Sequence, residues 1–415
     1  MKKNLLLAAL LFILNTAYSQ FTIYNTINSG LTDNYCWFVN QNTAGDVWVG
    51  TQSGGANKFN GTTWTNYTTT NSGILSNNIT PIAFLAGNPW IGTNSSGLSV
   101  YNGTSWTNFK TSTSPICGDD IMSIAFDATG NAWIATRYNG ICKFDGVNWS
   151  CYTTTNSAIP SNQVYQVEVD ASGNVWAGFP LKGLAKFNGS TWTAYTTTNS
   201  PLPNNDVYAL KYNTATNSLW IGTNGGLAVL TGTTWAIHTT TTAGFPNNYV
   251  RGISHTYSTG NTWIATGSGG IGCWDGFSWK TYNTITSNLP SNSVWAIKSG
   301  AGGKVWGALW GAGIVCMADQ PSGIRESQAA AFELYLQPNP AGDYSQIKIK
   351  SEKGGKGAIK VSDITGKTIY MRDLSVNTNE LQSIDIDLTG FSSGFYSCSL
   401  ILNDQVVTKK LIIQK

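Results

Sequence analysis

The chain of 415 residues is long enough for two or three domains, and only 11% of its residues are charged, with a net charge of +3. Lysines and arginines are spread thinly, so the sequence lacks the basic patch that nucleic-acid or membrane-surface binding requires. Glycine (45 residues) and tryptophan (17 residues) are abundant. Together with the low charge, this composition indicates a sheet-rich extracellular protein whose exposed strand faces are polar but uncharged.

The N-terminus has the pattern of a secretory signal peptide. Lys2 and Lys3 precede an apolar run from Leu5 to Leu14, and small residues follow around Ser19. The run is too short to span a membrane, and we expect cleavage to leave Gln20 as the mature terminus. Residues 1–19 are thus the predicted signal peptide, and no later segment predicts a transmembrane helix.

Residues 20–318 repeat with a period of roughly 43 residues, the length expected of a propeller blade of four strands. Each repeat carries a first tryptophan, and a second follows in the first six repeats. The first series is Trp48, Trp90, Trp133, Trp176, Trp220, Trp263 and Trp306, and the second is Trp64, Trp106, Trp149, Trp192, Trp235 and Trp279. Because both series hold fixed strand positions, we interpret them as packing residues between blades.

Each repeat predicts four short strands, which we call A to D. In the repeat at 163–195, strands A to D are predicted at 163–170, 174–179, 184–187 and 192–195, with Gly, Asn and Ser in the turns. A glycine recurs after strand B, where the hairpin requires a positive φ. The positions are Gly55, Gly97, Gly140, Gly183, Gly226, Gly270 and Gly313.

The last repeat lacks its strand D. Seven strands A are predicted, beginning near Tyr35, Ile79, Ile121, Val164, Val207, Val250 and Val294, but the seventh repeat stops after strand C. The D-strand phrase WTNYTTTNS (64–72) has an isolated counterpart, FTIYNTINS, at 21–29. We therefore predict an all-β, seven-bladed β-propeller whose last blade is closed by the N-terminal strand.

The repeats WIGTNSSGLSVYNGTSWTNF (90–109) and WIGTNGGLAVLTGTTW (220–235) resemble the two-component regulator propeller family. The resemblance covers nearly all of 20–318 and implies the seven-bladed fold of sensor ectodomains. The copies WAGF (176–179) and WGALW (306–310) depart from the pattern. Neither a transmembrane helix nor a kinase segment is predicted, so the resemblance implies the propeller and not signalling.

Beyond residue 318 the composition changes. Residues 319–331 form a predicted linker, and 332–415 carry the alternation of a small Ig-like β-sandwich. This block resembles the C-terminal sorting domain of the type IX secretion system, through Pro338-Asn339-Pro340, DITGK (363–367), LTGFSSGFY (388–396) and the terminal KKLIIQK. The resemblance implies the type IX secretion machinery as a partner. It also implies passage through the periplasm to the outer-membrane surface of a Gram-negative bacterium or to the medium.

The sequence offers few groups for catalysis. The fold resembles propeller lyases such as streptogramin lyase, in which histidine and glutamate surround the channel with magnesium, and His255 with Glu168 is the one candidate dyad. His238 replaces a D-strand tyrosine and is interpreted as a packing residue. Asp119-Asp120 is interpreted as a solvated turn and not as a calcium site. No metal and no cofactor is predicted.

The seven cysteines follow no disulfide framework. We interpret them as small buried strand residues, with Cys117–Cys151 as the one pair to check.

The predicted binding face carries the B–C turns and the D–A connections, because the C–D turns are near-copies of one another whereas the B–C turns vary. The candidate ligand-binding residues are Arg137, Tyr138, Phe179, Lys182, Tyr249, Arg251 and Trp310. Trp37 and Trp295 share an A-strand position with Tyr165 near the axis and are interpreted as packing residues.

The favoured function is a secreted or cell-surface recognition module for a glycan, peptide or protein ligand. A lyase or hydrolase using channel residues and a structural or adhesive surface component are the alternatives. We expect a monomer with no nucleic-acid partner.

Overall fold

The computed structural model describes residues 21–276, 278–319, 332–363, 367–402 and 405–415, in which every helical or extended element is a β-strand. The predicted signal peptide, residues 320–331 of the predicted linker and the centre of the DITGK turn lie outside this part of the chain. Within it, no helix is long and apolar enough to cross a membrane.

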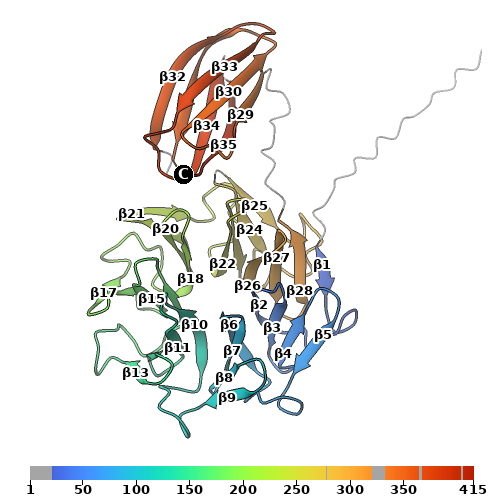
Figure 1. The fold of residues 1–415 in the computed structure, drawn as a ribbon, viewed down its shortest axis with the longest axis vertical. Coiled ribbons are helices and arrows are strands. Elements are labelled where there is room, and N and C mark those ends of the chain that lie inside the picture. Colours follow the sequence, from blue (N-terminus) through green and yellow to red (C-terminus); the bar gives the residue numbers. More distant parts are fainter. Residues whose placement is uncertain (1–20, 277, 320–331, 364–366, 403–404) are drawn as a thin grey trace, which may run out of the picture.

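Seven four-stranded antiparallel sheets surround a common axis (Figure 1), which confirms the predicted all-β propeller. The first three blades are β2 (Cys36–Gln41), β3 (Val47–Thr51), β4 (Ala56–Phe59) and β5 (Trp64–Tyr67); β6 (Ile79–Leu85), β7 (Asn88–Thr93), β8 (Leu98–Tyr101) and β9 (Trp106–Phe109); and β10 (Ile121–Phe126), β11 (Ala132–Thr136), β12 (Ile141–Phe144) and β13 (Trp149–Tyr152).

The next three blades are β14 (Gln166–Val169), β15 (Val175–Phe179), β16 (Gly183–Phe187) and β17 (Trp192–Tyr195); β18 (Val207–Asn213), β19 (Ser218–Thr223), β20 (Gly226–Thr231) and β21 (Thr234–His238); and β22 (Val250–Thr256), β23 (Asn261–Thr266), β24 (Ile271–Trp274) and β25 (Trp279–Tyr282). In every blade the first strand is the innermost and the fourth is the outermost (Figure 1).

The seventh blade is completed by the other end of the chain. It contains β26 (Val294–Gly300), β27 (Lys304–Leu309), β28 (Gly313–Ala318) and β1 (Thr22–Tyr24), and β1 pairs antiparallel with β28. Phe21 is 4% exposed, and the Asn288 side chain accepts from its N–H at 2.7 Å and donates to its carbonyl at 2.9 Å. The predicted closing strand is therefore present, and it pairs the free edge of β28.

The two tryptophan series hold neighbouring strands and blades together. Trp48 of strand B stacks on Tyr67 of strand D at 5.2 Å between ring centroids, and Trp64 stacks on Phe59 at 4.9 Å. Tyr67 also meets Trp106 of the next blade edge to face at 5.9 Å. Aromatic pairs at these separations contribute beyond the apolar area they bury, so both series are structural.

The phrase TTTNS forms the turn that follows the outer strand of the first, third and fourth blades. In the first blade, Asn71 accepts from the N–H of Thr68 and donates to the carbonyl of Asn66, while the Ser72 hydroxyl donates to the carbonyl of Thr68. The copies at 153–157 and 196–200 repeat these hydrogen bonds. The phrase recurs because its side chains satisfy the backbone groups that the end of a strand leaves free.

The glycine after each strand B has a positive φ, as predicted. At Gly55, with φ of 79°, an added Cβ would lie 2.2 Å from the carbonyl oxygen of Tyr67. The B–C turns are also bonded to the D–A connections, since Arg137 donates its N–H to the carbonyl of Asp120 at 2.9 Å and Asn94 donates to Asn78 at 3.1 Å. These two sets of segments therefore share one face.

Cys117 and Cys151 form a disulfide that links the start of the third blade to its outer strand. Cys142, opposite Cys151 in the same sheet, accepts a hydrogen bond from the N–H of Cys117 at 3.1 Å and is fully buried. The remaining cysteines are Cys36, Cys273, Cys316 and Cys398, and all are buried. The pair singled out from the sequence is thus bonded, and the others pack in the core.

The C-terminal block is a β-sandwich. One sheet contains β29 (Phe332–Gln337), β30 (Tyr344–Ser351) and β33 (Leu381–Asp387), and the other contains β32 (Thr368–Val376), β31 (Gly355–Ser362), β34 (Gly394–Leu402) and β35 (Gln405–Ile413). Alternate residues of both sheets, among them Ile347, Ile359 and Leu400, are fully buried in one core. This two-sheet packing agrees with the predicted sandwich.

Candidate functional site

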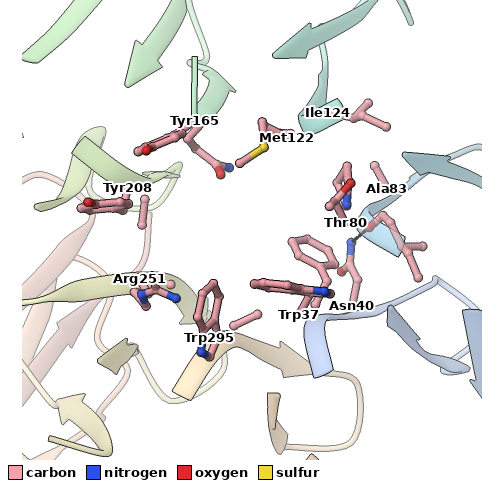
Figure 2. A pocket seen from close by; sticks show the side chains of 18 of the residues that line it. Trp37, Asn40, Thr80, Ala83, Met122, Ile124, Tyr165, Tyr208, Arg251 and Trp295 are labelled. Atoms are coloured by element: carbon pink, nitrogen blue, oxygen red, sulfur yellow. Dashed lines mark hydrogen bonds between the residues drawn. The ribbon is translucent and has the colours of Figure 1, made fainter. Parts of the chain in front are cut away.

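A cavity of about 740 Å³ lies on the propeller axis and is lined by the inner strands of all seven blades (Figure 2). The first residue of each inner segment is completely buried between blades; these residues are Cys36, Ile79, Ile121, Val164, Val207, Val250 and Val294. Strand side chains alternate in direction, so the next residue faces the axis. These next residues are Trp37, Thr80, Met122, Tyr165, Tyr208, Arg251 and Trp295, which we call the first axial ring.

The inner strands that carry the first axial ring are irregularly paired with strand B. In six of the seven blades, the pairing of the inner strand with strand B slips just after its first residue, as between Cys36 and Phe38 and between Val294 and Ala296. Such bulges leave one residue out of the ladder and redirect its side chain, and they are frequent next to functional sites. The bulges here shift the alternation of the strand, so that the residue after the buried first residue and the residue three positions later both line the cavity, as do Trp37 and Asn40.

Five members of the first axial ring form a continuous arc of flat groups, which we call the aromatic arc. It runs through Trp37, Trp295, Arg251, Tyr208 and Tyr165. The Trp37 and Trp295 rings are 4.5 Å apart, the Arg251 guanidinium lies 3.3 Å from the centroid of Trp295, and Tyr208 stacks on Tyr165 at 5.1 Å. All five side chains are half-buried, so each keeps part of its surface free for a ligand.

A second set of side chains lies deeper along the same strands, each paired across the sheet with the strand-B tryptophan. It consists of Asn40, Ala83, Glu168, Lys211, Ser254 and Lys298, which we call the second axial ring. Lys211 donates to Glu168 at 2.7 Å, and burial together with the repulsion of Lys211 lowers the pKa of Lys298 to about 8. The cavity thus combines an aromatic mouth with a charged interior.

Three of the predicted ligand-binding residues line this cavity, namely Arg137, Tyr138 and Arg251. Tyr138 is 58% exposed, and Arg137 forms an ion pair with Asp120 at 2.9 Å. Two more, Trp310 and Tyr249, contact residues of the aromatic arc. The Trp310 ring lies 4.5 Å from Trp37, and the Tyr249 hydroxyl accepts a hydrogen bond from Arg251.

The other two predicted ligand-binding residues lie elsewhere. Phe179 ends β15 and is completely buried in the core between the third and fourth blades, so its ring is not available for stacking on a ligand. Lys182 is exposed in the same turn but does not line the cavity. Neither Phe179 nor Lys182 therefore lines the axial cavity.

The predicted dyad of His255 and Glu168 is wrong. Glu168 faces the axis, where it accepts from Lys211 and from the N–H of Tyr212 at 3.2 Å. His255 follows the axial residue Ser254 and so points the opposite way, into the space between blades, where it bonds Thr262 at 2.9 Å and packs on Trp220. Burial lowers the pKa of His255 to about 3, so the imidazole is neutral.

Asp120 also differs from its interpretation as a solvated turn. Its side chain is 15% exposed, lines the cavity and holds Arg137, while Asp119 accepts from the N–H of Thr111 at 2.8 Å. Burial raises the pKa of Asp120 above its usual range although Arg137 opposes the shift. A carboxylate next to a B–C arginine fixes the direction of that arginine at the cavity mouth.

The sequence reasoning missed the aromatic arc as a site. The sequence places Trp37 and Trp295 at the position of Tyr165 near the axis but favours packing for the two tryptophans, and it does not single out Tyr208. The signal that identifies them is the column after the buried first residue of each strand A, which reads W, T, M, Y, Y, R, W around the ring. Five large flat groups out of seven at an axial position exceed what closing the ring needs, since Thr80 and Met122 fill the same position with smaller or more flexible side chains.

Comparison with known proteins finds matches for both the propeller and the C-terminal block. Residues 335–414 match the model of the secretion system C-terminal sorting domain. No curated protein matches the chain. Among solved structures, the extracellular domain of the hybrid two-component system BT3049 from B. thetaiotaomicron has a TM-score of 0.65 at 17% identity, over 96% of this chain and 58% of that chain.

Two further structures resemble the chain. PorZ, a surface component of the type IX secretion system of Porphyromonas gingivalis, has a TM-score of 0.57 at 16% identity, over 93% of this chain and 60% of PorZ. Streptogramin B lyase has a TM-score of 0.58 at 14% identity, over 72% of this chain and 98% of the lyase. The chain thus spans about three fifths of the BT3049 domain and of PorZ.

Identities this low show the fold alone. The chain is therefore a seven-bladed propeller with the fold found in these structures, followed by a secretion system C-terminal sorting domain.

Proposed function

We propose that this protein is a recognition module of the cell surface or the extracellular medium, exported by type IX secretion, that binds a glycan, peptide or protein segment in its axial cavity. The sorting domain supports the export route. The aromatic arc at the mouth of the cavity carries the binding proposal, because half-buried tryptophan, tyrosine and arginine side chains around a concave site are the usual anchors of ligand recognition.

The charges within the cavity favour binding over catalysis. Glu168 is engaged by Lys211, and Asp120 is engaged by Arg137, so both carboxylates have positioning partners. The neutral His255 lies outside the cavity wall and cannot exchange a proton with a ligand held there. The residues around the axis offer stacking faces and hydrogen-bond donors, which are the requirements of recognition.

The proposal is tested with glycan and peptide arrays probed with the mature protein. Trp295→Ala removes the ring of the aromatic arc that contacts both Trp37 and Arg251, and it should weaken a specific signal by roughly 30-fold, since truncation of an anchor residue costs about 2 kcal/mol or more. Tyr138→Ala should weaken the same signal by less, because its ring is 58% exposed.

Val147→Ala is the matched control, because Val147 is 82% exposed in a C–D turn on the opposite face. Melting temperatures of all variants separate loss of binding from loss of fold. A signal that is unchanged in Trp295→Ala but lost in Val147→Ala would place binding on the opposite face and refute the proposal.

A further inference from the structure

The wall of the axial cavity carries more positive charge than its carboxylates neutralise. Four cationic side chains line it, against two carboxylates; the cations are Arg137, Lys211, Arg251 and Lys298, and the carboxylates are Asp120 and Glu168. Arg137 pairs with Asp120 at 2.9 Å and Lys211 pairs with Glu168 at 2.7 Å. Arg251 and Lys298 thus form no ion pair within the described part of the chain.

Arg251 lies in the first axial ring without a carboxylate partner among the described residues. Its guanidinium carbon lies over the Trp295 and Tyr249 rings, at 3.3 and 4.5 Å from the two ring centroids, so these two neighbours offer it π faces and no carboxylate. Its side chain donates one hydrogen bond, to the Tyr249 hydroxyl, and its Nε has no acceptor among the described residues. The Trp295 ring and the hydrogen bond to Tyr249 hold the guanidinium in one orientation, in which it can donate to an oxyanion.

Lys298 is the cation of the second axial ring that, like Arg251, has no ion-pair partner among the described residues. The residues at the same position on the two neighbouring blades are Ser254 and Asn40, which are neutral. Burial lowers its pKa, and the nearest charges act in opposite directions, since Lys211 repels the ammonium and Glu168 attracts it. A partly buried ammonium that lacks a carboxylate partner lowers the stability of the folded protein. Such a group is expected where a bound ligand supplies the negative charge.

We propose that the axial cavity binds a sugar that carries an oxyanion, a carboxylate or a phosphate, with the sugar ring packed on the aromatic arc and the oxyanion bound by Arg251 and Lys298. This inference rests on the proposed function and specifies its ligand class. Trp295 and Lys298 both lie on β26, and Arg251 lies on β22 of the neighbouring blade, so the two cations and part of the aromatic arc line the same side of the cavity.

Three probes that differ only at one carbon test this inference, namely glucose, glucuronate and glucose 6-phosphate. Their affinities for the mature protein are measured by isothermal titration calorimetry at low ionic strength. We expect one or both anionic probes to bind roughly tenfold more tightly than glucose, because charge-assisted hydrogen bonds are about twice as strong as neutral ones. The ratio between glucuronate and glucose 6-phosphate distinguishes a carboxylate ligand from a phosphate ligand.

Lys298→Met should reduce this preference by roughly tenfold and leave the affinity for glucose within about twofold. Arg251→Gln should also reduce the preference, but it should weaken the binding of glucose as well, because Arg251 belongs to the aromatic arc. Lys186→Met removes the same charge on the outside of the propeller, where Lys186 lies over the Trp176 ring, and should change neither affinity. In the wild type, but not in Lys298→Met, binding of the anionic probe should weaken as the pH rises through about 8.

Equal affinity for glucose and both anions, or no saturable binding of any probe, would overturn the inference. So would equal effects of Lys298→Met and Lys186→Met. The proposed function is tested separately. If an array ligand requires Trp295 but neither Lys298 nor Arg251, the proposed function holds and this inference fails.

Discussion

Closure of the ring by the N-terminal strand can be tested at a single side chain, Phe21. This residue is 4% exposed, meets Tyr282 edge to face at 6.0 Å and packs in the cluster that contains Leu289 and Met317. Truncation of a buried phenylalanine to alanine costs about 3–5 kcal/mol. We take the lower end of this range and expect Phe21→Ala to cost about 3 kcal/mol.

The expected change in melting temperature follows from the size of the propeller. Unfolding entropy is about 2.1 cal/mol/K per residue, so roughly 300 residues give about 0.6 kcal/mol/K. A loss of about 3 kcal/mol then lowers the melting temperature by about 5 °C. Calorimetry of the mature protein measures this shift in the propeller transition.

Ile27→Ala is the control for Phe21→Ala. Ile27 lies a few residues later in the same segment and is 92% exposed, so its truncation should leave the transition unchanged. A shift below about 1 °C for Phe21→Ala, or equal shifts for both variants, would show that the N-terminal strand does not stabilise the seventh blade.

Three further predictions concern the disulfide, Lys298 and the sorting domain. Cys117→Ser with Cys151→Ser should cost about 4 kcal/mol in equilibrium denaturation, from the loop entropy of a 34-residue separation, and an unchanged midpoint would contradict this. Lys298→Met should raise the free energy of unfolding at neutral pH by roughly 1–3 kcal/mol, because the pKa of Lys298 is lowered to about 8 and the unfolded chain therefore binds the proton more tightly. That gain should shrink as the pH rises from about 8 to about 10.5 and the wild type recovers its stability, so a gain that is constant with pH would refute the assignment. Deletion of 332–415 should leave a folded propeller inside the cell envelope of its host, and normal amounts outside the cell would contradict the sorting role.

The periodic features of the sequence predicted the fold well, because each depends on local chemistry. The glycine at Gly55 is needed where a Cβ would meet a carbonyl oxygen, and the closing strand was recognisable because Phe21–Tyr24 repeats the outer-strand pattern without its blade. Both features are determined by contacts within one blade, so the same residues recur in the sequence of each repeat.

The site was predicted less well because it arises between repeats. Trp37 and Trp295 stand more than 250 positions apart in the sequence, and only closure of the ring brings their rings to 4.5 Å. The same strand alternation that turns Ser254 to the axis turns His255 away from it, which a list of titratable residues does not reveal. Phe179 was chosen from a variable turn, but it is the last residue of its strand and completes the core.

The central claim, that the axial cavity is the binding site, is tested most directly by filling the cavity without removing any contact. Ala83 lines the wall opposite the aromatic arc (Figure 2), and Ala83→Trp should occupy the space that a ligand needs. The measurement is the affinity of this variant for the ligand selected on the arrays, with its melting temperature as the check on folding. We predict loss of detectable binding in a protein that still unfolds cooperatively; wild-type affinity in the folded variant would contradict the claim.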